Sequence, residues 1–385
     1  MSAPAPTLAV IGGGQLARMM AQPAIALGLP LRLLAEAEGV SAAQVIPDHL
    51  VGDYRDLDTL VKATDGCAVV TFDHEHVPTG HLHALEDAGL AVRPGPGALV
   101  HAQDKGVMRA RLAELDVPCP RNALVGSLAD VEAFGLPCVL KTTRGGYDGK
   151  GVWFVSTPEE CAGPLRVAEE TGVRLLAEER VDFRRELSAL VARSPSGQAA
   201  AYPVVASTQK DGICHEVIAP APDLAPALAG QAQEIALRIA GALDVTGILA
   251  VELFETTDGR VLVNELAMRP HNTGHWTQDG AVTSQFENHL RAVMDLPLGS
   301  PTPRARWTVM VNILGGPDET GRLYDGYPHA LARDPFLRVH LYGKDLRPGR
   351  KVGHVNAYGD DLDDCLERAR HAAAWFRGDL GDESE

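Results

Sequence analysis

The stretch LAVELFETTDGRVLVNELA, residues 249–267, decides how this chain folds. It consists of two apolar runs, 249–256 and 261–267, on either side of the pair Asp258-Gly259. An Asp-Gly pair between two apolar runs is typical of a type I′ turn, which joins two antiparallel strands. The stretch therefore predicts a β-hairpin with a two-residue turn.

Two carboxylates are expected to face each other across this hairpin. With a two-residue turn, Glu252 falls directly opposite Glu265, on strands that otherwise carry Leu, Val, Ala and Phe. Like charges in that position are destabilising, and a divalent cation that bridges them removes the penalty. Mg²⁺ prefers carboxylate oxygens and keeps positions open for phosphate oxygens, so the pair predicts a magnesium site beside Asn264, with Mn²⁺ as the alternative ion. Without a metal, the alternative is a protonated or solvent-facing pair.

A glycine-rich loop, RGGYDGKG at 144–151, precedes the hairpin by about a hundred residues. It joins an apolar run that ends at Lys141 to a second run, in which we expect Trp153 and Phe154 to lie in the core. A P-loop joins a strand to a helix, whereas this loop joins strand to strand, so it predicts a flap across the end of a hairpin. Glycine amides and two basic residues suit a mobile cover that closes over polyphosphate, with Lys141 as a further phosphate contact. The alternative is a solvated hairpin tip.

The N-terminal residues alternate apolar runs with helical patterns. Strands are expected at 7–11, 30–35 and 68–72, with a helix at 15–29 between the first two. This βαβ pattern predicts a parallel sheet that is covered by helices.

The first of these strands leads into GGGQLA at 12–17, which satisfies the dinucleotide fingerprint G-x-G-x-x-G/A, and Glu36 follows near the end of the next strand. The same pattern suits any phosphate, because glycines let the backbone approach an anion and a helix N-terminus offers free N–H groups. We expect a phosphorylated small molecule at the N-terminus of the helix that begins near Gln15. An NAD ligand and a purely structural turn are the alternatives.

The chain has 385 residues and a formal net charge of −16, with 45% hydrophobic and 22% charged residues. The length predicts two or three globular domains. The negative net charge argues against a protein whose main function is to bind nucleic acid or an anionic membrane surface. Positive charge for a phosphate must then be concentrated locally, and we expect 141–151, Arg269 and 344–351 to converge on one cleft. The six cysteines show no metal-site spacing, so reduced thiols in a cytoplasmic protein are expected. No signal peptide and no membrane span are indicated.

Changes in composition and in hydrophobic pattern along the chain predict three segments. They are an N-terminal Rossmann-like substrate-binding domain at 1–102, a central domain at 103–298, and a C-terminal domain at 299–385 that contains an amphipathic helix at 361–376. The expected fold class is a mixture of α/β and α+β, with a parallel N-terminal sheet followed by antiparallel strands.

A flap followed by a paired-carboxylate hairpin is similar to the ATP-grasp superfamily, and within it the chain resembles the N5-carboxyaminoimidazole ribonucleotide synthase family. The resemblance covers most of the chain and is most specific around 264–281. It implies an ATP-grasp fold with an N-terminal Rossmann-like (pre-ATP-grasp) domain and a small C-terminal domain. It is carried by GGGQLARM (12–19), TFDHEH (71–76), KTTRGGYDGKG (141–151), FRREL (183–187), YPVV (202–205), QKDGI (209–213), LAVELF (249–254), VLVNELAMRPHNTGHWTQDGA (261–281) and GRKVGHV (349–355).

The resemblance also implies roles for individual residues. Those implied in ATP binding are Lys105, Lys141, Gly146, Tyr147, Asp148, Gly149, Lys150, Gly151, Val152, Glu178, Glu179, Arg180, Val181, Glu186, Gln209, Asn264 and Glu265. Those implied for the ribonucleotide and bicarbonate are Gln15, Glu75, Arg269, His271, Asn272, Arg350 and Lys351. The implied metal ligands are Glu252 and Glu265, and the implied catalytic residues are Arg269, Lys141 and Asp148. Departures from the family's usual residues include Lys105 for Arg, Met268 for Pro and, relative to some members, Gln209 for His.

The activity implied by the resemblance is ATP-dependent carboxylation of 5-aminoimidazole ribonucleotide by bicarbonate, which gives N5-carboxyaminoimidazole ribonucleotide, ADP and phosphate in purine biosynthesis. The resemblance further implies a cytoplasmic homodimer that passes its product to a separate mutase and binds neither nucleic acid nor membrane. Other functions stay open: another ATP-grasp ligase that couples formate or an amino acid, an NAD-dependent oxidoreductase, or a nucleotide sensor. A sensor would keep the flap without needing both Glu252 and Glu265.

Overall fold

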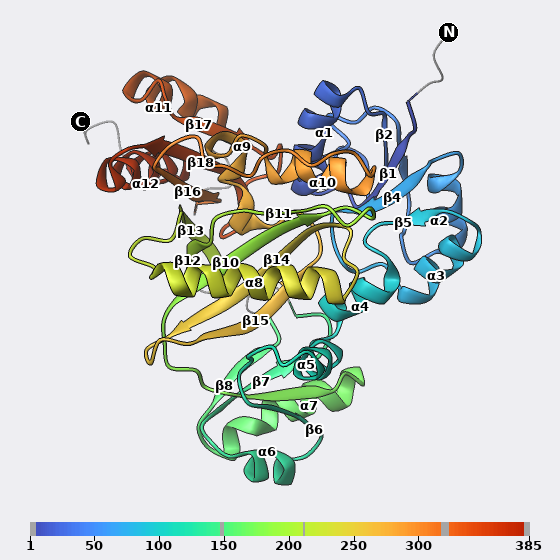
Figure 1. The fold of residues 1–385 in the computed structure, drawn as a ribbon, viewed down its shortest axis with the longest axis vertical. Helices are drawn as coiled ribbons and strands as arrows, with labels where there is room; N and C mark the ends of the chain where they lie inside the picture. Colours follow the sequence, from blue (N-terminus) through green and yellow to red (C-terminus); the bar gives the residue numbers. More distant parts are fainter. Residues whose placement is uncertain (1–4, 147–149, 211, 317–322, 381–385) are drawn as a thin grey trace.

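The computed structural model describes residues 5–146, 150–210, 212–316 and 323–380, and the strands of these residues form three sheets (Figure 1). The N-terminal sheet is parallel, with the strand order β3-β2-β1-β4-β5, so the expected parallel sheet is confirmed. Its central strands are fully buried, as expected where helices cover both faces of a sheet. The elements of this part are β1 (Leu8–Ile11), α1 (Gln15–Leu27), β2 (Leu31–Ala35), β3 (His49–Val51), α2 (Leu57–Thr64), β4 (Val69–Phe72), α3 (Thr79–Asp87), β5 (Ala91–Val92) and α4 (Pro96–Gln103).

The second sheet is antiparallel and has the order β6-β9-β7-β8. Lys141 on β7 pairs with Val152 on β8, so the glycine-rich loop joins two adjacent antiparallel strands, as the sequence predicts. This part lies at the bottom of Figure 1. Its elements, together with the helix that leads into it, are α5 (Lys105–Glu114), β6 (Asn122–Val125), α6 (Leu128–Phe134), β7 (Cys138–Thr142), β8 (Val152–Val155), α7 (Ala162–Thr171) and β9 (Leu175–Glu179).

The third sheet has nine strands, in the order β15-β14-β10-β12-β13-β16-β18-β17, and β11 pairs with β10. Strands β16, β17 and β18 come from the predicted C-terminal segment, yet they extend this sheet, so the domain limits at 102/103 and 298/299 stay predictions. The expected amphipathic C-terminal helix is α12, whose N-cap is Asp361. Among the described residues, no helix is both long enough and apolar enough to cross a bilayer. The elements are β10 (Phe183–Arg193), β11 (Ala199–Ala201), β12 (Val205–Lys210), β13 (Ile213–Ala219), α8 (Pro226–Ala242), β14 (Gly247–Thr256), β15 (Val261–Ala267), α9 (Thr277–Gly280), α10 (Gln285–Val293), β16 (Trp307–Leu314), α11 (Tyr327–Arg333), β17 (Arg338–Leu341), β18 (Lys351–Gly359) and α12 (Leu362–Arg377).

The turn between β14 and β15 is longer than the sequence predicts. The backbone N–H of Thr256 donates to the carbonyl of Arg260 at 2.9 Å, so the loop holds three residues, 257–259, and not two. Gly259 has a φ of +82°, the left-handed conformation that closes a three-residue hairpin loop. The expectation of a two-residue type I′ turn is therefore wrong, because an Asp-Gly pair suits both kinds of turn.

A β-bulge restores the register that the longer turn would have lost. Leu253 pairs with Val263, but the next pair is Glu252 with Glu265, which leaves Asn264 as the extra residue on β15. The predicted opposition of the two carboxylates is thus confirmed, although by another route than the predicted turn.

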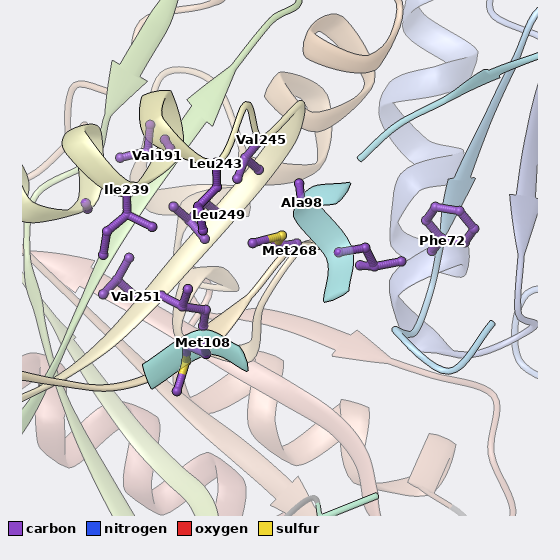
Figure 2. Packing of buried hydrophobic residues seen from close by; sticks show 14 of the residues in the cluster. Phe72, Ala98, Met108, Val191, Ile239, Leu243, Val245, Leu249, Val251 and Met268 are labelled. Atoms are coloured by element: carbon purple, nitrogen blue, oxygen red, sulfur yellow. The ribbon is translucent and has the colours of Figure 1, made fainter. Parts of the chain in front are cut away.

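One buried core joins the N-terminal sheet to the nine-stranded sheet. Phe72, Ala98, Met108, Val251 and Met268 belong to the same cluster, and Figure 2 shows them together. Each is 4% exposed or less. Burial of apolar surface stabilises the folded state by about 25 cal/mol per Å². The core therefore fixes the end of β4 relative to the end of β15, where the candidate site residues lie.

Candidate active site

A cavity of about 1520 Å³ opens where the three sheets meet. Its walls come from the start of α1, from the loop after β4, from the flap strands β7 and β8, and from β9, β10, β14 and β15. In a parallel sheet such as the N-terminal one, ligands usually bind at the carboxyl ends of the strands.

The cross-strand pair Glu252 and Glu265 lies on the cavity wall, and both side chains are partly exposed. His271 Nε2 lies 3.2 Å from Glu252 Oε1, and Lys105 Nζ lies 2.5 Å from Glu265 Oε1. Burial acts to raise the pKa of Glu252, but the hydrogen bond and charge of His271, with Lys105 and Arg269 nearby, outweigh it and leave that pKa below its usual value. Two facing carboxylates provide the oxygen ligands that a hard divalent cation prefers, so these residues fit Mg²⁺.

The bulge at Asn264 brings two consecutive side chains of β15 to the cavity. Neighbouring side chains of a regular strand point to opposite faces, yet Asn264 and Glu265 both line the wall. Asn264 Oδ1 accepts a hydrogen bond from Lys141 Nζ at 3.0 Å, and the same ammonium group lies 2.7 Å from Glu178. Strands β7, β9 and β15 therefore meet at the Lys141 side chain.

Behind this wall lies Arg109, a buried cation that sequence analysis missed. Its side chain is 2% exposed, and its Nε lies 2.6 Å from Glu178. The other guanidinium nitrogens donate to the backbone oxygens of Val263 at 2.9 Å and Asn264 at 2.7 Å. Burial acts to lower the pKa of Arg109, but the charge of Glu178 outweighs it and raises that pKa. Arg109 therefore holds the bulge from behind, and nothing in KGVMRARLAE distinguishes it from a surface arginine.

Glu75 connects the N-terminal sheet to the residues that follow β15. Its Oε2 lies 3.0 Å from Arg269 Nε, and its Oε1 accepts a hydrogen bond from the backbone N–H of Met268 at 2.8 Å. Burial acts to lower the pKa of Arg269, but Glu75 and then Asp73 outweigh it and raise that pKa. Arg269 is thus a permanently charged group with a fixed guanidinium plane on the cavity wall.

The N-terminal glycine loop donates hydrogen bonds to two of the chain's own carboxylates, and the expected phosphate at this helix stays a prediction. Asp73 accepts hydrogen bonds from the N–H groups of Gly14 at 3.1 Å and Ala17 at 2.7 Å, and Glu36 accepts one from Gly13 at 3.0 Å. A Cβ on Gly14 would lie 2.2 Å from Asp73 Oδ2, so the glycine makes room for this carboxylate. A phosphate bound at this helix would therefore have to use other N–H groups of the first turn or replace these carboxylates.

Aromatic side chains form an apolar wall at the flap end of the cavity. The rings of Phe183 and Phe254 stack with their centroids 4.8 Å apart, and both line the cavity. Phe154 also lines it and is 70% exposed, so the expectation that this residue lies in the core is wrong. A strand pattern shows that alternate residues share a face, but not whether that face meets a core or a cavity. Flat apolar surfaces of this kind suit a heteroaromatic ring.

Glu186 on β10 also lines the cavity. Burial, followed by the charge of Glu252, raises the pKa of Glu186 to about 7, while Lys141 acts in the opposite direction. This carboxyl group is therefore close to half-ionised at neutral pH, so hydrogen bonds from a ligand will favour its ionised form.

The structure brings most residues implied by the family resemblance to one cavity wall. Those that line it are Gln15, Glu75, Lys105, Lys141, Gly146, Lys150, Val152, Glu178, Glu179, Arg180, Val181, Glu186, Gln209, Glu252, Asn264, Glu265, Arg269, His271, Asn272 and Lys351. Gly151 and Arg350 do not line it. Tyr147, Asp148 and Gly149 lie outside the described residues. The individual roles of all these residues stay predictions.

Charge in the cavity is arranged in pairs and does not form the net positive cleft that the sequence predicts. Five of the expected basic residues do line the wall: Lys141, Arg144, Lys150, Arg269 and Lys351. Lys344 and Arg347 line a separate cavity. Carboxylates line the first cavity in at least equal number, and they neutralise Lys105, Lys141 and Arg269 at short range.

Comparison with known families assigns consecutive parts of the chain to three domain families. Residues 5–103 match the ribonucleotide synthetase preATP-grasp domain, residues 110–286 the ATP-grasp domain, and residues 308–368 the phosphoribosylaminoimidazole carboxylase C-terminal domain. The chain is 54% identical to N5-carboxyaminoimidazole ribonucleotide synthase of Mycobacterium tuberculosis over 377 residues, which cover 97% of this chain and 88% of the relative. This chain belongs to the N5-carboxyaminoimidazole ribonucleotide synthase family.

Solved structures of N5-carboxyaminoimidazole ribonucleotide synthases share this fold. The enzyme of Thermus thermophilus is 38% identical with a TM-score of 0.85, and the match covers 98% of this chain and 100% of that one. The enzyme of Aspergillus clavatus, solved with ADP and 5-aminoimidazole ribonucleotide, is 28% identical with a TM-score of 0.88, and the match covers 97% and 99% of the two chains. The expected ATP-grasp fold with a pre-ATP-grasp domain and a C-terminal domain is confirmed.

Proposed function

We propose that the protein catalyses the ATP-dependent carboxylation of 5-aminoimidazole ribonucleotide with bicarbonate, giving N5-carboxyaminoimidazole ribonucleotide, ADP and phosphate in purine biosynthesis. The observation that carries the proposal is a single cavity that holds the Glu252–Glu265 pair, Lys141 of the flap strand, and the Arg269–Glu75 pair. Such a cavity can hold a polyphosphate beside a small carboxylate-like anion. Family membership supports this choice over a ligase for formate or an amino acid.

The reaction transfers a phosphoryl group and then a carboxyl group. An oxygen of bicarbonate attacks the γ-phosphorus of ATP, the bond from that phosphorus to the bridging oxygen breaks, and ADP leaves carboxyphosphate behind. The amine of the ribonucleotide then forms a bond to the carboxyl carbon and loses a proton. Either the amine displaces phosphate from carboxyphosphate, or carboxyphosphate first breaks into CO₂ and phosphate and the amine adds to the CO₂. Because the first nucleophile is already an anion, the protein must mainly position and neutralise anions. Carboxyphosphate reacts with water, so the reaction needs an enclosed site.

The nucleotide occupies the end of the cavity between the flap strands and β10. Lys105, Lys141 and the flap residues at 146–152 contact its phosphates, with Asp148 as a predicted catalytic residue. The segment 178–181 binds the edge of the adenine, whose faces suit the aromatic wall. Glu186 accepts hydrogen bonds from the ribose hydroxyls, and Gln209 contributes a further polar contact.

Glu252 and Glu265 are the proposed ligands of Mg²⁺, with Mn²⁺ as the alternative. An ion held by these two carboxylates would supply charge neutralisation and orientation for the phosphate oxygens. In this structure Lys105 Nζ and His271 Nε2 contact these two carboxylates, so an ion held there would have to share or displace these contacts.

The ribonucleotide and bicarbonate occupy the opposite end, beside the loops after β4 and β15. Arg269 holds bicarbonate, because Glu75 fixes its guanidinium group on the cavity wall. Asn272 offers a buried amide whose oxygen and nitrogen have no hydrogen-bond partner among the described residues, which suits a polar ligand. The other proposed contacts are Gln15, His271 and Lys351, whereas Arg350, which the resemblance also implies, does not line the cavity.

The test is the release of ADP by the purified protein with Mg²⁺ and ATP. We expect full release only when bicarbonate and 5-aminoimidazole ribonucleotide are both present, with N5-carboxyaminoimidazole ribonucleotide formed in equal amount. Release that depends instead on formate or on an amino acid would overturn the proposal in favour of another ATP-grasp ligase.

The proposal includes a cytoplasmic homodimer that passes its product to a separate mutase. Light scattering after size-exclusion chromatography tests the dimer. A coupled assay tests the transfer: adding a mutase that acts on N5-carboxyaminoimidazole ribonucleotide should draw the reaction forward without changing the rate of ADP release at saturation.

A further inference from the structure

A buried amide behind the cavity holds the loop that carries His271. Gln285, the first residue of α10, is 0% exposed and is not among the residues that line the cavity. Its Oε1 accepts a hydrogen bond from the backbone N–H of His271 at 2.8 Å, and its Nε2 donates one to the backbone carbonyl of His271 at 2.7 Å. One side chain thus satisfies both backbone groups of a single loop residue, as a neighbouring strand would.

The orientation of this amide is fixed by its partners. Nε2 also lies 3.0 Å from Nδ1 of His275, which must accept the hydrogen bond because the amide nitrogen can only donate. A flipped amide would set donor against donor at the N–H of His271 and acceptor against acceptor at its carbonyl. Gly274 permits the close approach, since a Cβ there would lie 2.3 Å from Gln285 Oε1. The loop is therefore built around the Gln285 side chain.

The His271 side chain connects this loop to the Glu252–Glu265 pair. Its Nε2 lies 3.2 Å from Glu252, and its Nδ1 lies 2.8 Å from Thr273 Oγ1, which is itself 2.7 Å from Ser188 Oγ. The imidazole is thus held at both ring nitrogens, and its backbone is held by Gln285. Arg269, two residues earlier, is fixed by Glu75 from the other side.

We infer that Gln285 is a positioning residue for the carboxylation reaction. By holding both backbone groups of His271, it sets where His271 and Arg269 present their side chains to the substrate anions. This inference rests on the proposed function, because the consequence that it predicts is a change in how the ribonucleotide and bicarbonate are used. Displacement of reacting groups by about 1 Å can cost roughly a hundredfold in rate.

Asn288, on the same helix, provides a matched control. It is also 0% exposed, and its amide makes the same kind of pair with a single loop residue, accepting from the N–H of Gly299 at 2.7 Å and donating to its carbonyl at 3.1 Å. Its Nδ2 donates a third hydrogen bond to Tyr202 at 2.8 Å. The two amides thus lose equal numbers of hydrogen bonds on substitution, but only Gln285 holds a residue of the cavity wall.

The experiment compares Gln285→Met with Asn288→Leu in the full chain. Both variants should lower the melting temperature by a similar few degrees. Gln285→Met should lower kcat and raise the KM values for bicarbonate and the ribonucleotide, with a combined loss of roughly ten- to a hundredfold, while the Kd for ADP stays within about twofold. Asn288→Leu should leave all of these constants within about twofold of the wild type. Equal kinetic losses in the two variants, or none in Gln285→Met, would overturn the inference.

Amide hydrogen exchange at His271 provides a readout that does not depend on activity. Gln285→Met should accelerate this exchange and Asn288→Leu should not, because only the first variant frees the His271 N–H. Unchanged exchange in Gln285→Met would show that Gln285 does not hold the His271 backbone, and it would overturn the inference. If the wild-type protein shows no ribonucleotide-dependent ADP release, the proposed function is wrong, but faster exchange in Gln285→Met would still show that Gln285 holds this backbone. If Gln285→Met fails to fold, Gln285→Glu keeps the size and the acceptor for the His271 N–H but removes both donors, and it should show the same kinetic difference from Asn288→Leu.

Discussion

Glu252 and Glu265 are direct cross-strand partners, and the bulge at Asn264 between β14 and β15 brings them into register. The bulge also lets Asn264 and Glu265 line the same cavity, although they are consecutive in the sequence. Arg109 binds the backbone oxygen of Asn264 from behind, and Lys141 binds its side chain from the front. An irregularity in strand pairing therefore assembles the candidate metal ligands and Lys141, the proposed phosphate contact, into one wall.

Replacing Glu265 with Gln should remove most of the Mg²⁺-dependent turnover and leave the fold intact. The substitution keeps the size of the side chain but removes one of the two facing charges, so we expect kcat to fall by roughly a hundredfold or more. The melting temperature should change little, because the pair with Lys105 is partly exposed.

Asp258→Asn is the control, because it removes a carboxylate from the tip of the same hairpin, where the side chain is 58% exposed. It should keep wild-type turnover and the same dependence on the Mg²⁺ concentration. Near-normal activity in Glu265→Gln would argue against the metal assignment.

The stability of the protein should depend on pH through Glu186. Its pKa of about 7 in the folded state exceeds the ordinary value of 4.5, so the folded chain holds this proton longer than the unfolded chain. The stabilisation is full below about pH 4.5 and is lost as the pH rises to about 7. Glu186→Gln does not titrate, so its free energy of unfolding relative to wild type should increase over this range, by about 2 kcal/mol after allowance for partial exposure.

Urea unfolding of both proteins at pH 5 and pH 8, without nucleotide, measures this difference. A constant offset between wild type and Glu186→Gln would show that the group does not titrate in this range. Saturating ADP should reduce the effect if hydrogen bonds from the ribose stabilise the ionised form.

Local sequence patterns predict the elements of this fold better than they predict the contacts between them. The strands around Glu252 and Glu265 follow from apolar runs on either side of a turn, and the sheet near Gly14 follows from alternating strands and helices. The predicted turn length was wrong because an Asp-Gly pair suits both two-residue and three-residue hairpin loops. Here Thr256 Oγ1 accepts a hydrogen bond from the N–H of Arg260 at 2.8 Å, which stabilises the three-residue loop.

Contacts between distant residues account for what the sequence did not reveal. Asp73 caps a helix 56 residues earlier, Glu75 binds a backbone N–H 193 residues later, and Arg109 reaches a carbonyl 155 residues away. The glycine fingerprint shows only that a backbone must approach an anion, and it does not show whether that anion is a ligand or a side chain.

Replacing Gly14 with Ala should destabilise the protein strongly. The new Cβ would lie 2.2 Å from Asp73 Oδ2, so either the carboxylate or the start of α1 must shift, at a cost of about 2–4 kcal/mol in the free energy of unfolding. Gly80→Ala is the control, because a Cβ at this position in α3 meets nothing within 4 Å and should stabilise slightly. If Gly14→Ala unfolds at the wild-type urea concentration, the close approach of Asp73 to Gly14 contributes little to stability.

Replacing Lys351 with Ala should raise the KM for the ribonucleotide far more than the KM for ATP. The substrate phosphate carries nearly two negative charges at pH 7, so it needs a cationic side chain in addition to any N–H groups of α1. Lys351 lines the cavity, whereas Arg350 does not, and its guanidinium donates to the backbone carbonyl of Asp345 at 3.3 Å. We expect roughly a tenfold or larger rise in the KM for the ribonucleotide, as for loss of one charged hydrogen bond, and a change within about twofold for ATP.

Arg350→Ala, one residue away and also one positive charge fewer, separates a direct contact from a general loss of charge. It should raise the KM for the ribonucleotide by much less than Lys351→Ala does. Added salt should raise that KM in the wild type more than in Lys351→Ala, because the variant has already lost the interaction that salt screens. A larger effect from Arg350→Ala, or parallel rises for ribonucleotide and ATP in Lys351→Ala, would place the phosphate elsewhere than at this edge of the cavity.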